Sequence, residues 1–275
     1  MLALAGVAIT LQFGVTNYIN FAYGSYLMLA AYLAWEFNVH LGLNFWIATL
    51  ASAVCMGVIA VVINRVLLQP FAKRNLPFAY LLIVTLGLWL ILSDVIVLIW
   101  GTDTQQFDLG APSPPLKVGP FLFTPAQLLI MLIAASAMLG VHLLLTRTKL
   151  GKAMRAMADD ADLAQASGIN TDFMVNATWF LTGLLVGIAG CVLALNLSSF
   201  EPSAGDQIMF VIFSGVILGG IGQPYGAMLG ALIVGVVTEV SAVFLQSGAK
   251  ADVAYAILIL MLLVRPQGVI PARKT

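Results

Sequence analysis

The chain has 275 residues, of which 61% are hydrophobic and only 9% are charged. Soluble domains average about 45–50% apolar and about 25% charged residues, so this composition excludes a water-soluble globule and leaves a polytopic integral membrane protein. Twelve basic residues balance twelve acidic residues, so the chain also lacks the basic excess of a nucleic-acid-binding protein.

Six stretches of 19 to 35 residues contain no charged side chain. A helix needs about 20 apolar residues to cross a bilayer, and the alternating pattern of barrel strands is absent. We therefore expect an all-α fold with a short opening segment and about eight transmembrane helices. In chain order, the expected segments are 2–16, 18–37, 43–63, 77–100, 124–146, 174–197, 207–221, 224–246 and 253–265.

Glycine punctuates the later part of the chain. Gly219, Gly220, Gly222 and Gly226 surround Pro224, a combination that interrupts a helix, so this region is either a tight hairpin or one discontinuous helix. Glycines four residues apart also predict close contacts between helices. These pairs are Gly183 and Gly187, Gly215 and Gly219, and Gly226 and Gly230.

The positions of lysine and arginine predict the orientation of the spans. Ten of the twelve basic residues fall in segments 64–76 and 146–175 and in the C-terminal tail, which the predicted spans place on one side. Cytoplasmic loops of membrane proteins carry an excess of basic residues, so this side is expected to be the cytoplasm. The segment 101–123, with its Pro-Ser-Pro-Pro run at 112–115, is then expected outside.

Several chemistries find no support in the sequence. The chain has no GxxxxGK[ST] phosphate-binding loop, and its two histidines, His40 and His142, lack partners at metal-ligand spacing. No Ser-His-Asp pattern is convincing. We therefore expect no enzymatic activity, no catalytic residues, no cofactor and no metal site.

The polar segment 151–168 has the pattern of an amphipathic helix. At helical spacing, Met154, Met157, Ala161 and Ala164 form an apolar stripe. The charged residues Lys152, Arg155, Asp159 and Asp162 form another face. Gly168 is expected to end the helix in a left-handed cap. Such a helix either rests on the membrane surface or inserts its apolar stripe into a groove of a partner protein.

A few polar residues lie within the predicted spans. Asp94 and Glu239 are carboxylates in apolar surroundings, and Asn17, Asn20 and Tyr23 interrupt the first apolar stretch. A charge inside the membrane costs about 2.5–3.5 kcal/mol, so each carboxylate is expected to face a cavity, an interface or a polar partner. One interpretation assigns Asn17, Asn20, Tyr23 and Glu239 to a translocation path, with a break near Asn17. The alternative is a structural role for each.

Four blocks of sequence resemble the permeases of branched-chain amino acid ABC importers. They are INFAYG at 19–24, GKAMRAMADD at 151–160 with ASGINTD at 166–172, LGGIG at 218–222 with GAMLG at 226–230, and VRPQG at 264–268. Tyr23 stands where that family usually has histidine. The resemblance implies that a cytoplasmic segment at about 147–172 couples to an ATPase. Within it, the implied coupling residues are Gly151, Lys152, Met154, Arg155, Met157, Asp159, Asp160, Ala164 and Gly168.

The same resemblance implies a complex in a bacterial inner membrane. Two permease subunits, expected to form a heterodimer, would work with two separate ATP-binding subunits and an extracytoplasmic substrate-binding protein. The implied cargo is a branched-chain or related amino acid. A permease for urea or short amides is an alternative within the same family, and a stand-alone secondary transporter or channel is an alternative outside it.

Overall fold

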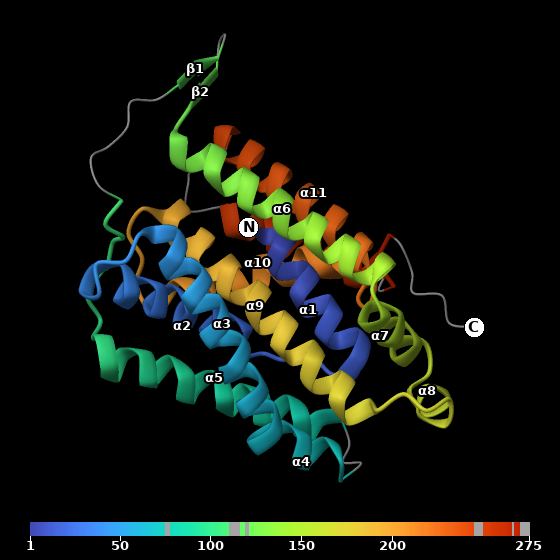
Figure 1. Cartoon of the computed structure of the whole chain (residues 1–275). Helices are drawn as coiled ribbons and strands as arrows, with labels where there is room; N and C mark the ends of the chain where they lie inside the picture. The colour runs from blue at the N-terminus through green and yellow to red at the C-terminus, as the bar shows by residue number, and fades with distance from the viewer. Residues whose placement is uncertain (75–77, 110–115, 119–120, 245–249, 266, 270–275) are drawn as a thin grey trace.

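The structure, a computed structural model, describes residues 1–74, 78–109, 116–118, 121–244, 250–265 and 267–269 (Figure 1). In the described residues it is a bundle of helices with one small antiparallel hairpin, and each of the nine predicted segments overlaps a helix. The helices are α1 Leu2–Thr16, α2 Tyr23–Trp35, α3 Phe45–Ile63, α4 Gln69–Ala72, α5 Phe78–Trp100, α6 Pro125–Arg147, α7 Lys149–Asp159, α8 Ala161–Ala166, α9 Thr171–Leu197, α10 Ala204–Gly219, α11 Pro224–Phe244 and α12 Lys250–Val264. The strands are β1 Leu116–Val118 and β2 Phe121–Phe123.

The long apolar helices confirm a polytopic membrane protein. In the described part of the chain, five helices are long and apolar enough to cross a bilayer. They are Phe45–Ala72, Ala79–Trp100, Pro125–Arg147, Thr171–Leu197 and Pro224–Phe244. The first of these joins α3 to α4 through a π-helical turn, Asn64–Leu68, and a second π-helical turn, Glu36–His40, extends α2. Helices α1 and α10 are apolar but shorter.

The prediction that a helix begins at residue 18 is wrong. Helix α1 ends at Thr16, Asn17 adopts a left-handed conformation with φ 57°, and α2 begins only at Tyr23. The intervening residues are apolar enough to be mistaken for helix, but the Asn20 side chain accepts a hydrogen bond from the backbone N–H of Ala22 at 3.0 Å. The expected break near Asn17 is therefore present, and it spans residues 17–22.

The glycine-rich region forms a tight helical hairpin. Helices α10 and α11 run antiparallel, because Gly219 meets Gly226 and Gly215 meets both Gly230 and Ala231. A Cβ atom added at Gly219 or Gly226 would overlap the carbonyl oxygen of the other, so the two backbones touch directly. This close approach confirms the packing predicted from the glycine spacing and selects the hairpin over the discontinuous helix.

Helix α9 is the central helix of the bundle (Figure 1). It packs against α1, α2 and α3, and much of its length is buried. Gly183 and Gly187 let α3 approach, since a Cβ at Gly187 would overlap the Cα of Ala53. Helices α5 and α6, by contrast, lie at the periphery with most of their apolar surface uncovered by this chain.

The three basic segments lie at one end of the bundle, as predicted. Lys73 forms an ion pair with Asp172, with 3.0 Å between Nζ and Oδ1, which joins segment 64–76 to the start of α9. The backbone N–H of Val269 donates to the carbonyl of Leu218 at 2.8 Å and so ties the C-terminal segment to the same end. Arg273, Lys274 and the Pro-Ser-Pro-Pro run at 112–115 lie outside the described residues.

This arrangement makes an accessibility prediction. In a variant with Cys55 and Cys191 replaced by alanine, a cysteine at Asp103 should react with an impermeant maleimide in intact cells. A cysteine at Arg155 should react only after the membrane is permeabilised. Both positions are exposed, but Asp103 follows the end of α5 and Arg155 is on α7, and these elements reach opposite ends of the bundle (Figure 1). Labelling of the Arg155 position in intact cells would reverse the predicted orientation.

Candidate functional site

The segment that was expected to be one amphipathic helix is two helices. Helix α7 ends at Asp159, and Asp160 adopts an extended conformation with φ −156° and ψ 110°. Its side chain then caps α8 by accepting a hydrogen bond from the N–H of Leu163 at 2.9 Å. The prediction of a continuous helix over 151–168 is wrong, because an aspartate that can cap a new helix starts one here.

The apolar stripe of this segment faces the protein itself. Met154 and Met157 are 2% and 5% exposed, and with Ala164 they form a cluster with Met174 of α9. Val15, at the end of α1, and Leu144 of α6 pack against the same cluster. The interpretation that these methionines insert into a partner is therefore wrong for this conformation, and Ala161, the fourth predicted member, is exposed.

Two glycines fix the position of the segment. A Cβ atom at Gly151 would overlap the carbonyl oxygen of Leu144 and lie 2.5 Å from the Cα of Leu145, so only glycine lets α7 fold back onto α6. Gly168 has φ +88°, and the N–H of Ile169 donates to the carbonyl of Ala164 at 3.1 Å. This is the left-handed cap predicted for Gly168, and Asn170 then caps α9 through the N–H of Phe173.

The outer face of the segment is accessible. Lys152, Arg155, Asp159 and Asp160 are exposed, and Leu163 on α8 is 65% exposed. This face thus combines both signs of charge with one large apolar side chain, and it projects from the basic end of the bundle (Figure 1). The apolar stripe predicted from periodicity did not include Leu163, which lies on the exposed face of α8.

The four residues assigned to a translocation path are not brought together. Asn20 and Tyr23 are buried beside the α1–α2 break, whereas Asn17 is exposed at the end of α1. Glu239 is on the outer surface of α11 with its side chain 73% exposed, and its Oε2 lies 2.8 Å from Nζ of Lys250. Glu239 therefore has a structural partner and does not line the interior of this chain. Asp94 is likewise exposed, on α5.

Asp206 is an intramembrane carboxylate that the sequence did not reveal. It lies in the first turn of α10 and is half-buried, and its Oδ1 accepts a hydrogen bond from Nε1 of Trp89 at 2.6 Å. Trp89 is at the middle of α5, so Asp206 lies beside the middle of that apolar helix. Beside it, the hydroxyls of Ser25 and Ser93 are 2.9 Å apart and link α2 to α5.

The chain matches the family model described as "Branched-chain amino acid transport system / permease component" over residues 1–265. The chain belongs to this permease family. It is 30% identical to the high-affinity branched-chain amino acid transport system permease protein LivH of Escherichia coli K12, over 98% of this chain and 90% of LivH. It is 29% identical to BraD of Pseudomonas aeruginosa, over 98% of this chain and 91% of BraD.

A more distant permease also matches. The fructose import permease FrcC of Rhizobium meliloti is 27% identical over 86% of this chain and 66% of FrcC. No solved structure matches the chain. Family membership makes this protein a multi-pass membrane permease of the ABC transporter class and a transport component rather than an enzyme, as the resemblance implied.

Proposed function

We propose that this permease forms the membrane path of an ATP-driven importer for branched-chain amino acids in a bacterial inner membrane. The observation that carries the proposal is the family match over nearly the whole chain, together with relatives that align over about nine-tenths of their length and whose names state this substrate class. We propose that it pairs with a second permease subunit and two separate ATPase subunits, and that a binding protein delivers the substrate. The absence of a phosphate-binding loop from the sequence supports a separate source of ATP hydrolysis.

The end opposite the basic segments offers a place for delivery. A cavity of about 780 Å³ opens there between the α2–α3 connection, the segment before residue 110 and the start of α6. Its walls carry both polar and apolar side chains, among them Asn38, Asn44, Trp46 and Thr124. We propose that substrate released by the binding protein enters the complex on this side.

We further propose that α7 and α8 transmit the conformational change of the ATPase to the helix bundle. The exposed face, with Lys152, Arg155, Asp159 and Leu163, would contact the ATPase. The buried Met154 and Met157 would instead hold the segment on α1, α6 and α9, so that it moves with the bundle. Gly151 and Gly168 would set its position, through close packing and a helix cap respectively.

The test is co-purification with the ATPases and leucine uptake by the complete transporter. Leu163→Asp should remove most ATPase association, since burying one leucine is worth roughly 1.5–3 kcal/mol and an exposed ion pair only about 0.2–1 kcal/mol. Reversing Asp159 alone should therefore do less.

Leu163→Met is the matched control, because it keeps an apolar side chain of similar size at the same exposed position, and it should behave like wild type. Wild-type co-purification and uptake by Leu163→Asp would show that α8 only rests on the membrane surface. A wild-type complex that imports urea or short amides but no leucine would overturn the proposed substrate class.

A further inference from the structure

Among the eight buried side-chain polar atoms that have no hydrogen-bond partner in the described residues, four lie on the α1–α2 break, the first turn of α2 and α9. They are Nδ2 of Asn20, the hydroxyl oxygens of Tyr23 and Tyr26, and Nε1 of Trp179. All four side chains are at least 97% buried. Buried polar groups in native proteins are almost always hydrogen-bonded, so each such group calls for a ligand, a water molecule or a functional reason.

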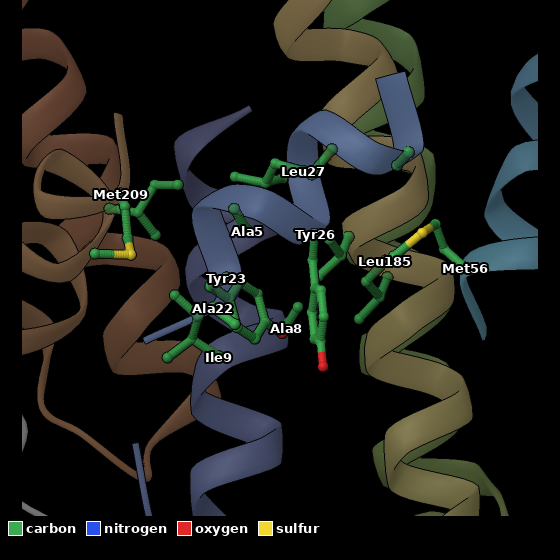
Figure 2. Close-up of a cluster of buried hydrophobic side chains, with 14 of the residues drawn as sticks. Ala5, Ala8, Ile9, Ala22, Tyr23, Tyr26, Leu27, Met56, Leu185 and Met209 are labelled. Atoms are coloured by element: carbon green, nitrogen blue, oxygen red, sulfur yellow. The ribbon is translucent and has the colours of Figure 1, made fainter. Parts of the chain in front are cut away.

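These atoms belong to one region, which we name the donor layer (Asn20, Tyr23, Tyr26 and Trp179). The rings of Tyr23 and Tyr26 are 6.2 Å apart between centroids. The Tyr26 hydroxyl lies toward the Asn20 amide, and the Tyr23 hydroxyl lies toward Thr182, one helical turn from Trp179 on α9. Figure 2 shows the Tyr26 side chain extending between α1 and α9, away from the apolar residues around Leu27.

The donor layer is rich in donors and poor in acceptors. An amide nitrogen and an indole nitrogen can only donate, and a tyrosine hydroxyl can donate as well as accept. Asn20 uses its oxygen for the N–H of Ala22, so only its donor end remains. No charged residue occurs in 1–35 or in 173–200, so neither segment supplies an ionic partner.

The start of α2 adds to this preference. Tyr23 is the first residue of α2, and no side chain caps the N–H groups of its first turn. The N-terminal end of a helix carries a partial positive charge and favours anions. In discontinuous membrane helices, such ends bind the anionic groups of substrates.

We propose that the donor layer binds the carboxylate of the transported amino acid. This inference rests on the proposed function. A carboxylate has two oxygens with about four acceptor positions, and Nδ2 of Asn20, Nε1 of Trp179 and the two tyrosine hydroxyls can all donate to such an acceptor. The labelled residues Ala8, Ile9 and Leu185 near the Tyr23 and Tyr26 side chains are apolar, as a branched aliphatic side chain requires (Figure 2). In the conformation described here the layer is closed, so substrate would enter when α1, α2 and α9 separate.

The test is thermal unfolding of the complete transporter, without binding protein, in the presence of three probes. Leucine and 4-methylpentanoate both carry a carboxylate, whereas leucinamide does not. We expect leucine and 4-methylpentanoate to raise the melting temperature of the wild type and leucinamide to leave it unchanged. In the double variant Tyr23→Phe/Tyr26→Phe, the apparent affinity for leucine should fall at least about tenfold. The variant without ligand should be at least as stable as wild type, because an unpartnered hydroxyl is removed.

Tyr32→Phe is the matched control. Tyr32 is also buried on α2 with an unpartnered hydroxyl, but it lies nine residues beyond Tyr23, or about 13 Å along the helix, beside Phe200 and Trp100. It should keep the wild-type response to all three probes. If the double variant does not assemble, the single variant Tyr26→Phe replaces it, and its apparent affinity for leucine should likewise fall.

Three results would each overturn the carboxylate site. They are equal stabilisation by leucinamide and leucine, no response of the wild type to leucine, and a wild-type response in the tyrosine variants. Leucine uptake by the same wild-type preparation in proteoliposomes separates the two proposals. Uptake with any of these results removes only the carboxylate site, whereas no uptake of any branched-chain amino acid removes the proposed function itself.

Discussion

Replacing Gly151 with leucine is expected to abolish ATPase association and transport while leaving the helical bundle inserted in the membrane. A Cβ at this position would overlap the carbonyl oxygen of Leu144, so α7 could not stay folded against α6. Overpacking usually costs about 1–3 kcal/mol, and here the neighbour is backbone, which cannot move aside as a side chain does. Because the methionine cluster depends on the same contact, Met154 and Met157 should lose their burial as well.

Gly140→Leu is the matched control for this substitution. Gly140 is on α6, the helix that precedes α7, and a Cβ there meets nothing within 4 Å. It should therefore preserve co-purification with the ATPases and leucine uptake. Limited proteolysis provides the structural readout: cleavage within 148–170 should increase in Gly151→Leu and stay unchanged in Gly140→Leu. Normal uptake by Gly151→Leu would show that the position of α7 is unimportant for coupling.

Replacing Asp206 with leucine is expected to weaken the packing of α5 against the bundle. Within the described residues, α5 is held mainly by α2, and Trp89 adds a hydrogen bond from its indole N–H to the Asp206 carboxylate. Hydrogen bonds to charged groups are worth about 1.5–3 kcal/mol, although polar contacts between membrane helices average nearer about 0.6. We therefore expect a loss of about 1–2 kcal/mol. The measurement is disulfide formation between cysteines at Ser25 and Ser93, whose hydroxyls are 2.9 Å apart.

A double-mutant cycle isolates this interaction. Trp89→Phe and Asp206→Leu should each lower the yield of the Ser25–Ser93 disulfide, and the double variant should lower it little further. Asp206→Asn keeps an acceptor for the indole N–H and should retain most of the yield. Additive effects of Trp89→Phe and Asp206→Leu would mean that the two side chains act independently.

The sequence predicted an all-helical membrane fold and the places of the apolar helices, because charge-free length is sufficient to identify them. It failed at the start of α2, where Tyr18, Ile19 and Phe21 continue the apolar character although the backbone is not helical. Hydropathy reports which solvent a residue prefers, not its φ and ψ angles. The left-handed Asn17 and the Asn20 side chain decide that conformation through hydrogen bonds that hydropathy does not measure.

The candidate sites, too, were predicted only in part from the sequence. Periodicity correctly placed Met154 and Met157 on one face, but it cannot tell whether a face is covered by a partner or by distant parts of the same chain, here α1 and α9. Asp206 was missed because it sits at the edge of an apolar stretch, where a carboxylate normally belongs to a loop. Only the fold shows that α10 begins beside the middle of α5, next to Trp89.

The packing of the cytoplasmic segment on α1 has a consequence for energetics. Gly14 of α1 lies next to Ala158 of α7, and Val15 packs on the methionine cluster. Five residues after Val15 the α1–α2 break reaches Asn20, and Tyr23 follows three residues later; both belong to the donor layer. Suppose that a partner bound to α7 and α8 moves α1 and so changes the affinity of the donor layer for the amino acid by some factor. Binding of the amino acid must then change the affinity for that partner by the same factor. Binding of the amino acid in the donor layer would then change how tightly α7 and α8 bind the ATPase.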